Sequence, residues 1–264
     1  PRYGRELERG MGLYRTTFTL PDTFADKRIY VRFEGVLYAY ELYINGKYAG
    51  KWDNAFNSRQ FDITQFISFN EQNTLAVKVM SFAENESHMF DMGDGWSLCG
   101  IFRDVVLFAV TNIHYSDMVF KSFVNEDNSA RIEIDAVINA LGLDRRGDLK
   151  SVAILLDADG KQVFSKDSLL PISNTESDTI RIAAVLQQPH LWTAETPYLY
   201  ELKLSLFQGE NAIQTIREKV GIREISIRDG VLLLNNSPFK LKGVSMHEIH
   251  PDRGRALTKD DWLA

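Results

Sequence analysis

The sequence predicts an all-β protein with two consecutive β-sandwiches, and three observations lead to this fold class. Short runs of β-branched and aromatic residues, in which apolar and polar positions alternate, occur along most of the chain. Turn residues separate these runs at intervals of about ten residues, as in sandwich folds. By contrast, the first 250 residues contain no segment with a helical period over three turns.

The first group of predicted strands lies within residues 1–111. Asn45 and Gly46 stand between two alternating runs and predict a two-residue hairpin turn, because both positions of such a turn require positive φ. The spacing of the runs is typical of a jelly-roll β-sandwich. The predicted strands are 13–20, 28–33, 40–44, 74–80 and 103–110.

A second group of predicted strands lies within residues 112–222. About seven strands in roughly 110 residues is the number expected of an immunoglobulin-like β-sandwich. The paired cysteines of antibody domains are absent, so this prediction depends on the alternation alone. The predicted strands are 113–123, 130–140, 150–156, 179–185, 199–207 and 212–220, with turns at 157–160 and 207–211.

The pattern changes in residues 223–264. Three short apolar strands are expected at 225–227, 231–234 and 239–244, the first two as a hairpin. A helix is expected to begin after Thr258 as N-cap, with Asp260 and Asp261 in its first turn. Because that helix has room for only two turns and no C-terminal cap, we expect a chain truncated inside a further domain.

Composition excludes several classes of function. The chain has 264 residues, of which 44% are apolar and 25% charged, and a net charge of −6. Nucleic-acid binders need clustered excess cations, so no nucleic-acid partner is expected. No apolar run approaches the ~20 residues that span a bilayer, so no membrane partner is expected. Cys99 is the single cysteine and allows no internal disulfide, which leaves the compartment open between cytoplasm and periplasm.

Four segments together carry a resemblance to a known family. They occur in that family's order, at compatible spacings, over nearly the whole chain. They are residues 100–105 (GIFRDV), 191–200 (LWTAETPYLY), 220–235 (VGIREISIRDGVLLLN) and 242–251 (KGVSMHEIHP). With them the chain resembles the large, bacterial-type soluble β-galactosidases of glycoside hydrolase family 2.

The resemblance implies three domains and a retaining hydrolase. The domains are a sugar-binding jelly roll (1–111), an immunoglobulin-like sandwich (112–222) and the truncated start of a TIM barrel (223–264). In retaining glycosidases two carboxylates about 5–5.5 Å apart flank the glycosidic bond, one as acid/base and one as nucleophile. In the family both are glutamates deep in the barrel, beyond residue 264, and a whole barrel needs about 250 residues. The chain alone is therefore expected to be inactive.

His250 is the first candidate site residue. It follows the expected first barrel strand, at the face where barrel enzymes build their active sites. The resemblance implies that it hydrogen-bonds sugar hydroxyls near the reacting centre, and an imidazole can donate or accept a hydrogen bond near neutral pH. The alternative is a surface histidine in the loop before Pro251.

His247 and Glu248 are expected to support this site by hydrogen bonding. The spacing of His247 and His250 is too short for a zincin motif, and no further ligands cluster nearby, so zinc is not expected. Ser245, Met246 and Ile249 stand where the family pattern has Asn, Arg and His, which leaves the exact sugar open.

Asp94 is the second candidate. Residues 91–96 (DMGDGW) resemble a family loop whose aspartate contacts galactose and a monovalent cation. A carboxylate accepts two hydroxyls at once and is a hard oxygen ligand suited to such an ion. The alternative is a turn former between two glycines. No cofactor is expected in this chain, whereas the resemblance implies Mg²⁺ and Na⁺ for the whole enzyme.

The aromatic side chains of Trp96, Trp52 and Tyr38 are either stacking platforms for sugar rings or, more commonly in a sandwich, core residues. Arg15, Arg103 and Arg223 are expected to pair with carboxylates or backbone carbonyls between domains through the guanidinium fork. Cys99, flanked by Leu98 and Gly100, is expected to be buried as a small hydrophobe.

Three functions remain open at this point. The first is a fragment of a β-galactosidase, which binds β-galactosides or related glycans, assembles with the rest of its barrel and forms homo-oligomers. The second is a stand-alone carbohydrate-binding module, and the third is a structural sandwich pair. Residues 239–264 favour the first, because a self-contained module does not need the start of a barrel. Within the enzyme class, β-glucuronidase and β-mannosidase have similar scaffolds.

Overall fold

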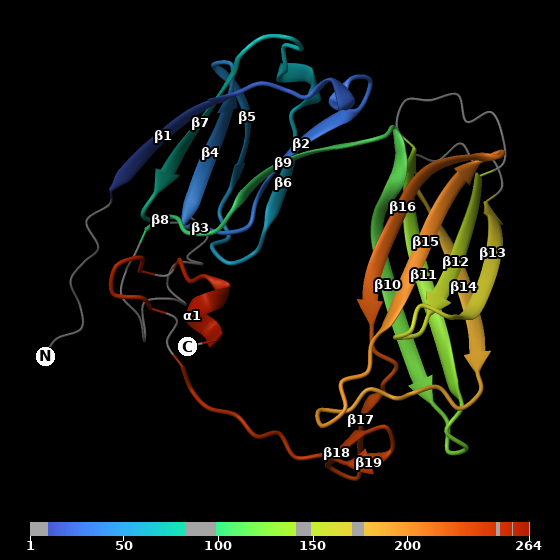
Figure 1. Ribbon diagram of the computed structural model, residues 1–264. Helices are drawn as coiled ribbons and strands as arrows, with labels where there is room; N and C mark the ends of the chain where they lie inside the picture. Colours follow the sequence, from blue (N-terminus) through green and yellow to red (C-terminus); the bar gives the residue numbers. More distant parts are fainter. Residues whose placement is uncertain are drawn as a thin grey trace, which may run out of the picture. The chain divides into compact units, whose positions relative to one another are not determined.

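The computed structural model describes residues 10–82, 99–140, 149–170, 177–246, 249–254 and 256–263 of the chain. They form two compact units, the first made of Pro1–Val110 with Val244–Ala264 and the second of Thr111–Gly243 (Figure 1). Strands dominate both units, which confirms the predicted fold class. None of the helices in the described ranges has the length and apolar character needed to cross a bilayer.

The first unit contains an antiparallel β-sandwich, as predicted. Its core lies between two sheets, where Val31 and Phe33 of one sheet face Leu42, Ile44 and Val77 of the other. One sheet has the order β1(Met11–Phe18), β7(Asn73–Met80), β4(Ala39–Ile44), β5(Lys47–Trp52), and the other has β6(Arg59–Asp62), β2(Arg28–Phe33), β9(Val105–Val110). The short β3(Val36–Leu37) pairs with β8(Gly100–Ile101), and single 3₁₀ turns occur at Asp22–Phe24 and Thr64–Phe66.

The predicted Asn-Gly hairpin is confirmed between β4 and β5. Asn45 and Gly46 have φ values of 49° and 77°. The Asn45 side chain also binds the rest of the unit, because its Nδ2 donates to Phe66 O at 2.9 Å and its Oδ1 accepts from Thr74 N at 2.8 Å. The turn residue thereby fixes the hairpin to the neighbouring loop and strand.

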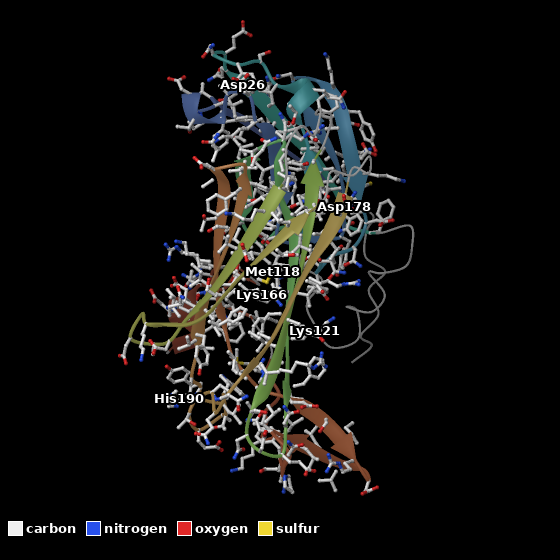
Figure 2. The ribbon with its side chains drawn as sticks, turned by 90° about the vertical axis from the view of Figure 1, so that its right-hand side faces the viewer. Asp26, Met118, Lys121, Lys166, Asp178 and His190 are labelled. Atoms are coloured by element: carbon white, nitrogen blue, oxygen red, sulfur yellow. The ribbon has the colours of Figure 1, made fainter. Side chains whose placement is uncertain are left out.

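The second unit contains the predicted immunoglobulin-like sandwich. Alternate residues of β11, such as Ile132 and Ile134, are buried against Leu202 and Leu204 of β15. Lys166, labelled in Figure 2, donates to Ala183 O at 3.0 Å and links the two sheets at one edge. The sheets have the orders β10(Ile113–Val124), β11(Ala130–Ala140), β14(Ser177–Leu186) and β13(Gln162–Leu170), β12(Leu149–Leu156), β15(Tyr200–Gln208), β16(Asn211–Val220).

Residues 225–238 form a hairpin that belongs to the second unit. The predicted strands appear as β17(Ile225–Arg228) and β18(Val231–Leu234), followed by the short β19(Ser237–Pro238). The predicted helix is present as α1(Lys259–Leu263), directly after Thr258. Thr258 N donates to Asp261 Oδ2 at 2.7 Å, which is the second half of a capping box.

The predicted strand 239–244 is wrong. After one backbone bond from Phe239 N to Leu232 O, this segment is irregular and the Leu241 and Val244 side chains are exposed. A parallel barrel strand is stabilised by hydrogen-bonded neighbours on both sides, and a barrel of about 250 residues supplies them from later strands. An apolar run without such neighbours does not form a ladder by itself.

A network of side-chain hydrogen bonds fixes the β17–β18 hairpin to the sandwich of the second unit. Glu224 Oε2 accepts from Val124 N at 2.7 Å, and Asn236 Nδ2 donates to Val124 O at 3.0 Å. Asn235 Oδ1 accepts from Glu224 N at 3.0 Å while its Nδ2 donates to Trp192 O at 3.0 Å. The hairpin is thus held from both of its ends.

Replacing Asn235 with alanine is expected to loosen this attachment. The variant loses two hydrogen bonds to partly buried backbone groups. This loss should lower the free energy of local unfolding of the hairpin by about 1–2 kcal/mol. Amide hydrogen exchange of β17 and β18 should accelerate, while that of β11 and β15 stays unchanged. Exchange that accelerates equally in all four strands would contradict a local role, and Ser237→Ala, at an exposed position of the same hairpin, is the matched control.

Candidate functional site

A cleft of about 780 Å³ opens within the first unit. Loops of the sandwich contribute Phe56, Phe102 and Arg103, and the segment around α1 contributes Ile249 and Trp262. Figure 1 shows α1 beside the end of the sandwich at which β3 and β8 lie. Small-molecule sites commonly have volumes of ~300–1,000 Å³, so the cleft is large enough for one.

His250 is held in a defined orientation next to this cleft. Its backbone exchanges two hydrogen bonds with Gly254, of 2.7 and 2.9 Å. Asp252 N donates to His250 Nδ1 at 3.1 Å, so Nδ1 acts as an acceptor and the ring proton resides on Nε2. Nε2 lies 3.7 Å from Asp261 Oδ1, and the side chain is 25% exposed. The cleft is lined by its neighbour Ile249, not by His250 itself.

Asp261, in the first turn of α1, is the acidic residue that faces His250. It accepts hydrogen bonds from Thr258 N at 2.7 Å and from Thr258 Oγ1 at 2.8 Å, and its carboxylate forms an ion pair with Arg253. These interactions lower the pKa of Asp261 to about 2, and the backbone hydrogen bond from Thr258 contributes most to the shift. The carboxylate facing His250 is therefore ionised throughout the neutral range.

The low pKa of Asp261 makes the first turn of α1 sensitive to acid. The native pKa of Asp261 lies below its ordinary value of 3.8. The ionised carboxylate therefore stabilises the folded state fully above about pH 4, and this contribution is lost as the pH falls through about 2. A carboxyl ¹³C titration should give a midpoint near 2 for Asp261. Thr258→Ala should raise that pKa, whereas Thr258→Ser keeps both donors. A midpoint near 4 in the unmodified chain would contradict this description.

Aromatic rings and a guanidinium group form the sandwich side of the cleft. The rings of Phe56 and Phe102 meet edge to face, with centroids 6.1 Å apart. The Arg103 guanidinium lies 5.0 Å from the Phe102 ring and donates to Phe56 O at 3.4 Å. The partner of Arg103 is thus a backbone carbonyl of its own unit, whereas a partner in another domain was expected. Gly35 permits the arrangement, because a Cβ atom there would lie 2.7 Å from the Phe102 ring.

The other predicted site residues belong to the segments around Asp94 and His247. Asp94, Trp96, His247 and Glu248 lie outside the described residues, so the role predicted above for each of them stays a prediction. Within the described ranges, no group of three or more His, Cys, Asp or Glu side chains is arranged to hold a metal ion.

Three further side chains were predicted as core or packing residues. Tyr38 is buried and Trp52 packs against the core, as expected. Cys99 was predicted to be buried and is instead exposed. β8 is only two residues long and begins at Gly100, so Cys99 precedes the strand and no alternation directs its side chain inward.

Most residues of the cleft were not predicted from the sequence. Phe56, Phe102 and Trp262 come from three separate segments, and no spacing in the sequence indicates that their rings line one cleft. The Thr258–Asp261 pair had a usable signal, since a Thr followed three residues later by an acidic residue is typical of a capped helix start.

Comparisons with known proteins place the chain in a family. The model of the sugar binding domain of glycosyl hydrolases family 2 matches residues 5–111, a second family 2 model matches 112–223, and the model of its TIM barrel domain matches 225–264. The chain belongs to glycosyl hydrolases family 2. The three models follow one another in order and together cover nearly all of it.

Curated relatives include β-galactosidases from Priestia megaterium and Halalkalibacterium halodurans. The one from Priestia megaterium is 31% identical over 258 residues, covering 96% of this chain and 24% of that protein. The one from Halalkalibacterium halodurans is 30% identical over 259 residues, covering 98% of this chain and 25% of that protein. The chain therefore spans about a quarter of the length of these relatives.

A solved β-glucuronidase is also similar in structure. The crystal structure of Bacteroides uniformis β-glucuronidase matches with a TM-score of 0.87 and 28% sequence identity, over 97% of this chain and 32% of that one. The chain is therefore similar to enzymes named for two different sugars.

Proposed function

We propose that the whole protein to which this chain belongs hydrolyses terminal β-D-galactosides with retention of configuration. The observation that carries this proposal is the match to named β-galactosidases over 96–98% of the chain, including the start of the barrel. In this account the chain supplies the sugar-binding and immunoglobulin-like domains. The two catalytic glutamates belong to later parts of the barrel, so the chain alone does not hydrolyse glycosides.

His250 has a defined role in this proposal. Its Nε2–H is a hydrogen-bond donor held in place by the bond from Asp252 N to Nδ1, and it is suited to a sugar hydroxyl. His247 and Asp94 are proposed as further sugar contacts, with Asp94 also a ligand for a monovalent cation such as Na⁺. Mg²⁺ is proposed as a second ion of the whole enzyme.

The runner-up is a β-glucuronidase, which the structural match to the Bacteroides uniformis enzyme favours. We would measure kcat/KM of the protein extended through its barrel on nitrophenyl β-galactoside, β-glucuronide and β-mannoside. A site that hydrogen-bonds the galactose hydroxyls should prefer the galactoside by about a hundredfold or more. Preference for the glucuronide would overturn the galactosidase proposal. Inactivity on all three, with glycan binding by this chain in calorimetry, would support a binding module.

We also propose that the whole protein is a homo-oligomer. The edge strand β1 exposes large apolar side chains, among them Met11, Leu13 and Tyr14, which favours a covered surface. Sedimentation velocity should show an assembly, and a strictly monomeric protein at micromolar concentration would contradict this proposal.

A further inference from the structure

We propose that the outer face of the sheet formed by β1, β7, β4 and β5 binds a chain of acidic sugars, such as a polyuronate. The rings of Tyr43 and Tyr48 contact the apolar faces of the sugars. The side chains of Arg15 and Lys51 bind their carboxylates. None of these side chains lines the cleft described above. The inference goes beyond the proposed function and does not depend on it, because this face holds a polysaccharide without cleaving it.

The register of the sheet places these side chains on the face that is turned away from the core. Tyr43 lies in β4 between two buried core residues, so its own side chain points outward. Tyr48 of β5 is opposite Tyr43. The row continues on the other side through Ala76 of β7 to Arg15 of β1. Residues opposite each other in paired strands share a face, and the four strands, side by side in Figure 1, span about 14 Å.

Two tyrosine rings form the apolar part of this face. The ring centroids of Tyr43 and Tyr48 are 5.6 Å apart and the rings meet edge to face at 68°. Tyr48 is 52% exposed. On the other side of Tyr43 stands Ala76, whose side chain is a single methyl group and leaves space beside the ring. Sugar rings have flat faces of C–H groups, which pack against aromatic rings as other apolar groups do.

Glu41, two residues before Tyr43 on the same face, holds the Tyr43 ring in place. Tyr43 Oη donates to Glu41 Oε2 at 2.8 Å, and Lys78 Nζ lies 3.4 Å from the same oxygen. The hydrogen bond from Tyr43 is the largest cause of the lowered pKa of Glu41, so the carboxylate stays ionised and accepts this bond at neutral pH. A side chain that is fixed before binding loses little conformational freedom when a ligand covers it.

The charges of the face are the third observation. Glu41 and Lys78 form an ion pair. Across the described ranges, neither Arg15 nor Lys51 forms one, although Lys51 is opposite Glu41 in the register. The face thus carries three cations and one anion, a net charge of +2, whereas the whole chain has a net charge of −6. Such a local excess of cations is complementary to a ligand with repeated negative charges.

Rings and cations together favour an acidic polysaccharide over other anionic chains. Each uronate has both a ring with an apolar face and a carboxylate, so every sugar along the chain matches both features. The guanidinium of Arg15 can bind a carboxylate through two parallel hydrogen bonds. A nucleic acid has a denser line of charge and needs many clustered cations, which a chain with a net charge of −6 does not offer.

Binding is tested on the 264-residue chain by calorimetry with an oligogalacturonate. The heat should saturate, and the affinity should fall as salt is added, because salt screens exposed charges. The methyl-esterified oligomer has the same rings without the charges and should bind several-fold more weakly. Tyr48→Ala should weaken binding about tenfold, and Lys51→Met about threefold. Phe69→Ala and Lys161→Met remove an exposed ring and an exposed cation elsewhere, so both should leave the affinity unchanged.

Three results would overturn the inference. The first is an oligogalacturonate that releases no heat, or that binds Tyr48→Ala and the unmodified chain equally well. The second is a single-stranded oligodeoxynucleotide that binds more tightly and depends on Tyr48, which would assign the face to nucleic acid. The third is an assembly in sedimentation velocity that Tyr48→Ala dissociates without weakening the glycan, which would assign the face to a second copy of the chain. In the protein extended through its barrel, Tyr48→Ala should leave kcat/KM on nitrophenyl β-galactoside unchanged, so this test and that of the proposed function are separate.

Discussion

Replacing Asn73 with alanine is expected to lower the free energy of unfolding of the first unit by about 3 kcal/mol or more. Asn73 is completely buried, and all of its hydrogen-bonding capacity is used. Its Oδ1 accepts from Asn45 Nδ2 at 2.8 Å and from Ser68 N at 2.9 Å. Its Nδ2 donates to Ser68 O at 2.9 Å and to Glu71 O at 3.2 Å. Truncation leaves these partly buried groups without partners, which is more damaging than the loss of an exposed bond.

The measurement is urea unfolding followed by amide signals of β7, which begins at Asn73, and of its neighbour β4. Gln72→Ala changes the preceding, exposed residue and should alter stability by less than about 0.5 kcal/mol. Equal effects of the two substitutions would show that the buried amide is not what fixes the loop between the Thr64–Phe66 turn and β7.

Leu204→Ala is expected to lower the free energy of unfolding of the second unit by about 2–5 kcal/mol. Leu204 lies in β15, paired with Ala153 on one side and Ile216 on the other, and it has no solvent exposure. The substitution removes buried methyl groups and leaves a cavity, because close-packed neighbours on both sheets relax only partly.

Leu199→Ala is the matched control for this prediction. Leu199 precedes β15 and is 41% exposed, so the same chemical change there should have an effect below about 1 kcal/mol. The free energy of unfolding, measured through the amide signals of β11 and β15, should differ between the two variants. A small effect at Leu204 would contradict the assignment of this residue to the sandwich core.

Strand positions were largely predictable from the sequence where one face of a strand is buried. The expected bounds 28–33 and 130–140 coincide with β2 and β11, because a half-buried strand alternates with a period of two. β13 was missed, since it is an edge strand with few buried side chains and therefore no such alternation. The strand expected at 239–244 failed for a different reason, because ladder partners and not apolar character decide whether a strand forms.

The candidate site was less predictable than the fold. His250 was singled out from the sequence, but its contacts with Gly254, Asp252 and Asp261 depend on how the chain turns back on itself. Asp261 was predicted only as an acidic residue of a first helical turn. The cleft between Phe56 and Trp262 joins residues about two hundred positions apart, and one sequence contains no local pattern for such a contact.

The most direct test of the central claim compares hydrolysis of nitrophenyl β-galactoside by this 264-residue chain and by the protein extended through its barrel. We predict that only the extended protein releases nitrophenol, because under the proposed function this chain provides the non-catalytic domains and the start of the barrel. Hydrolysis by the 264-residue chain would contradict that claim, since the catalytic carboxylates would then have to lie within it.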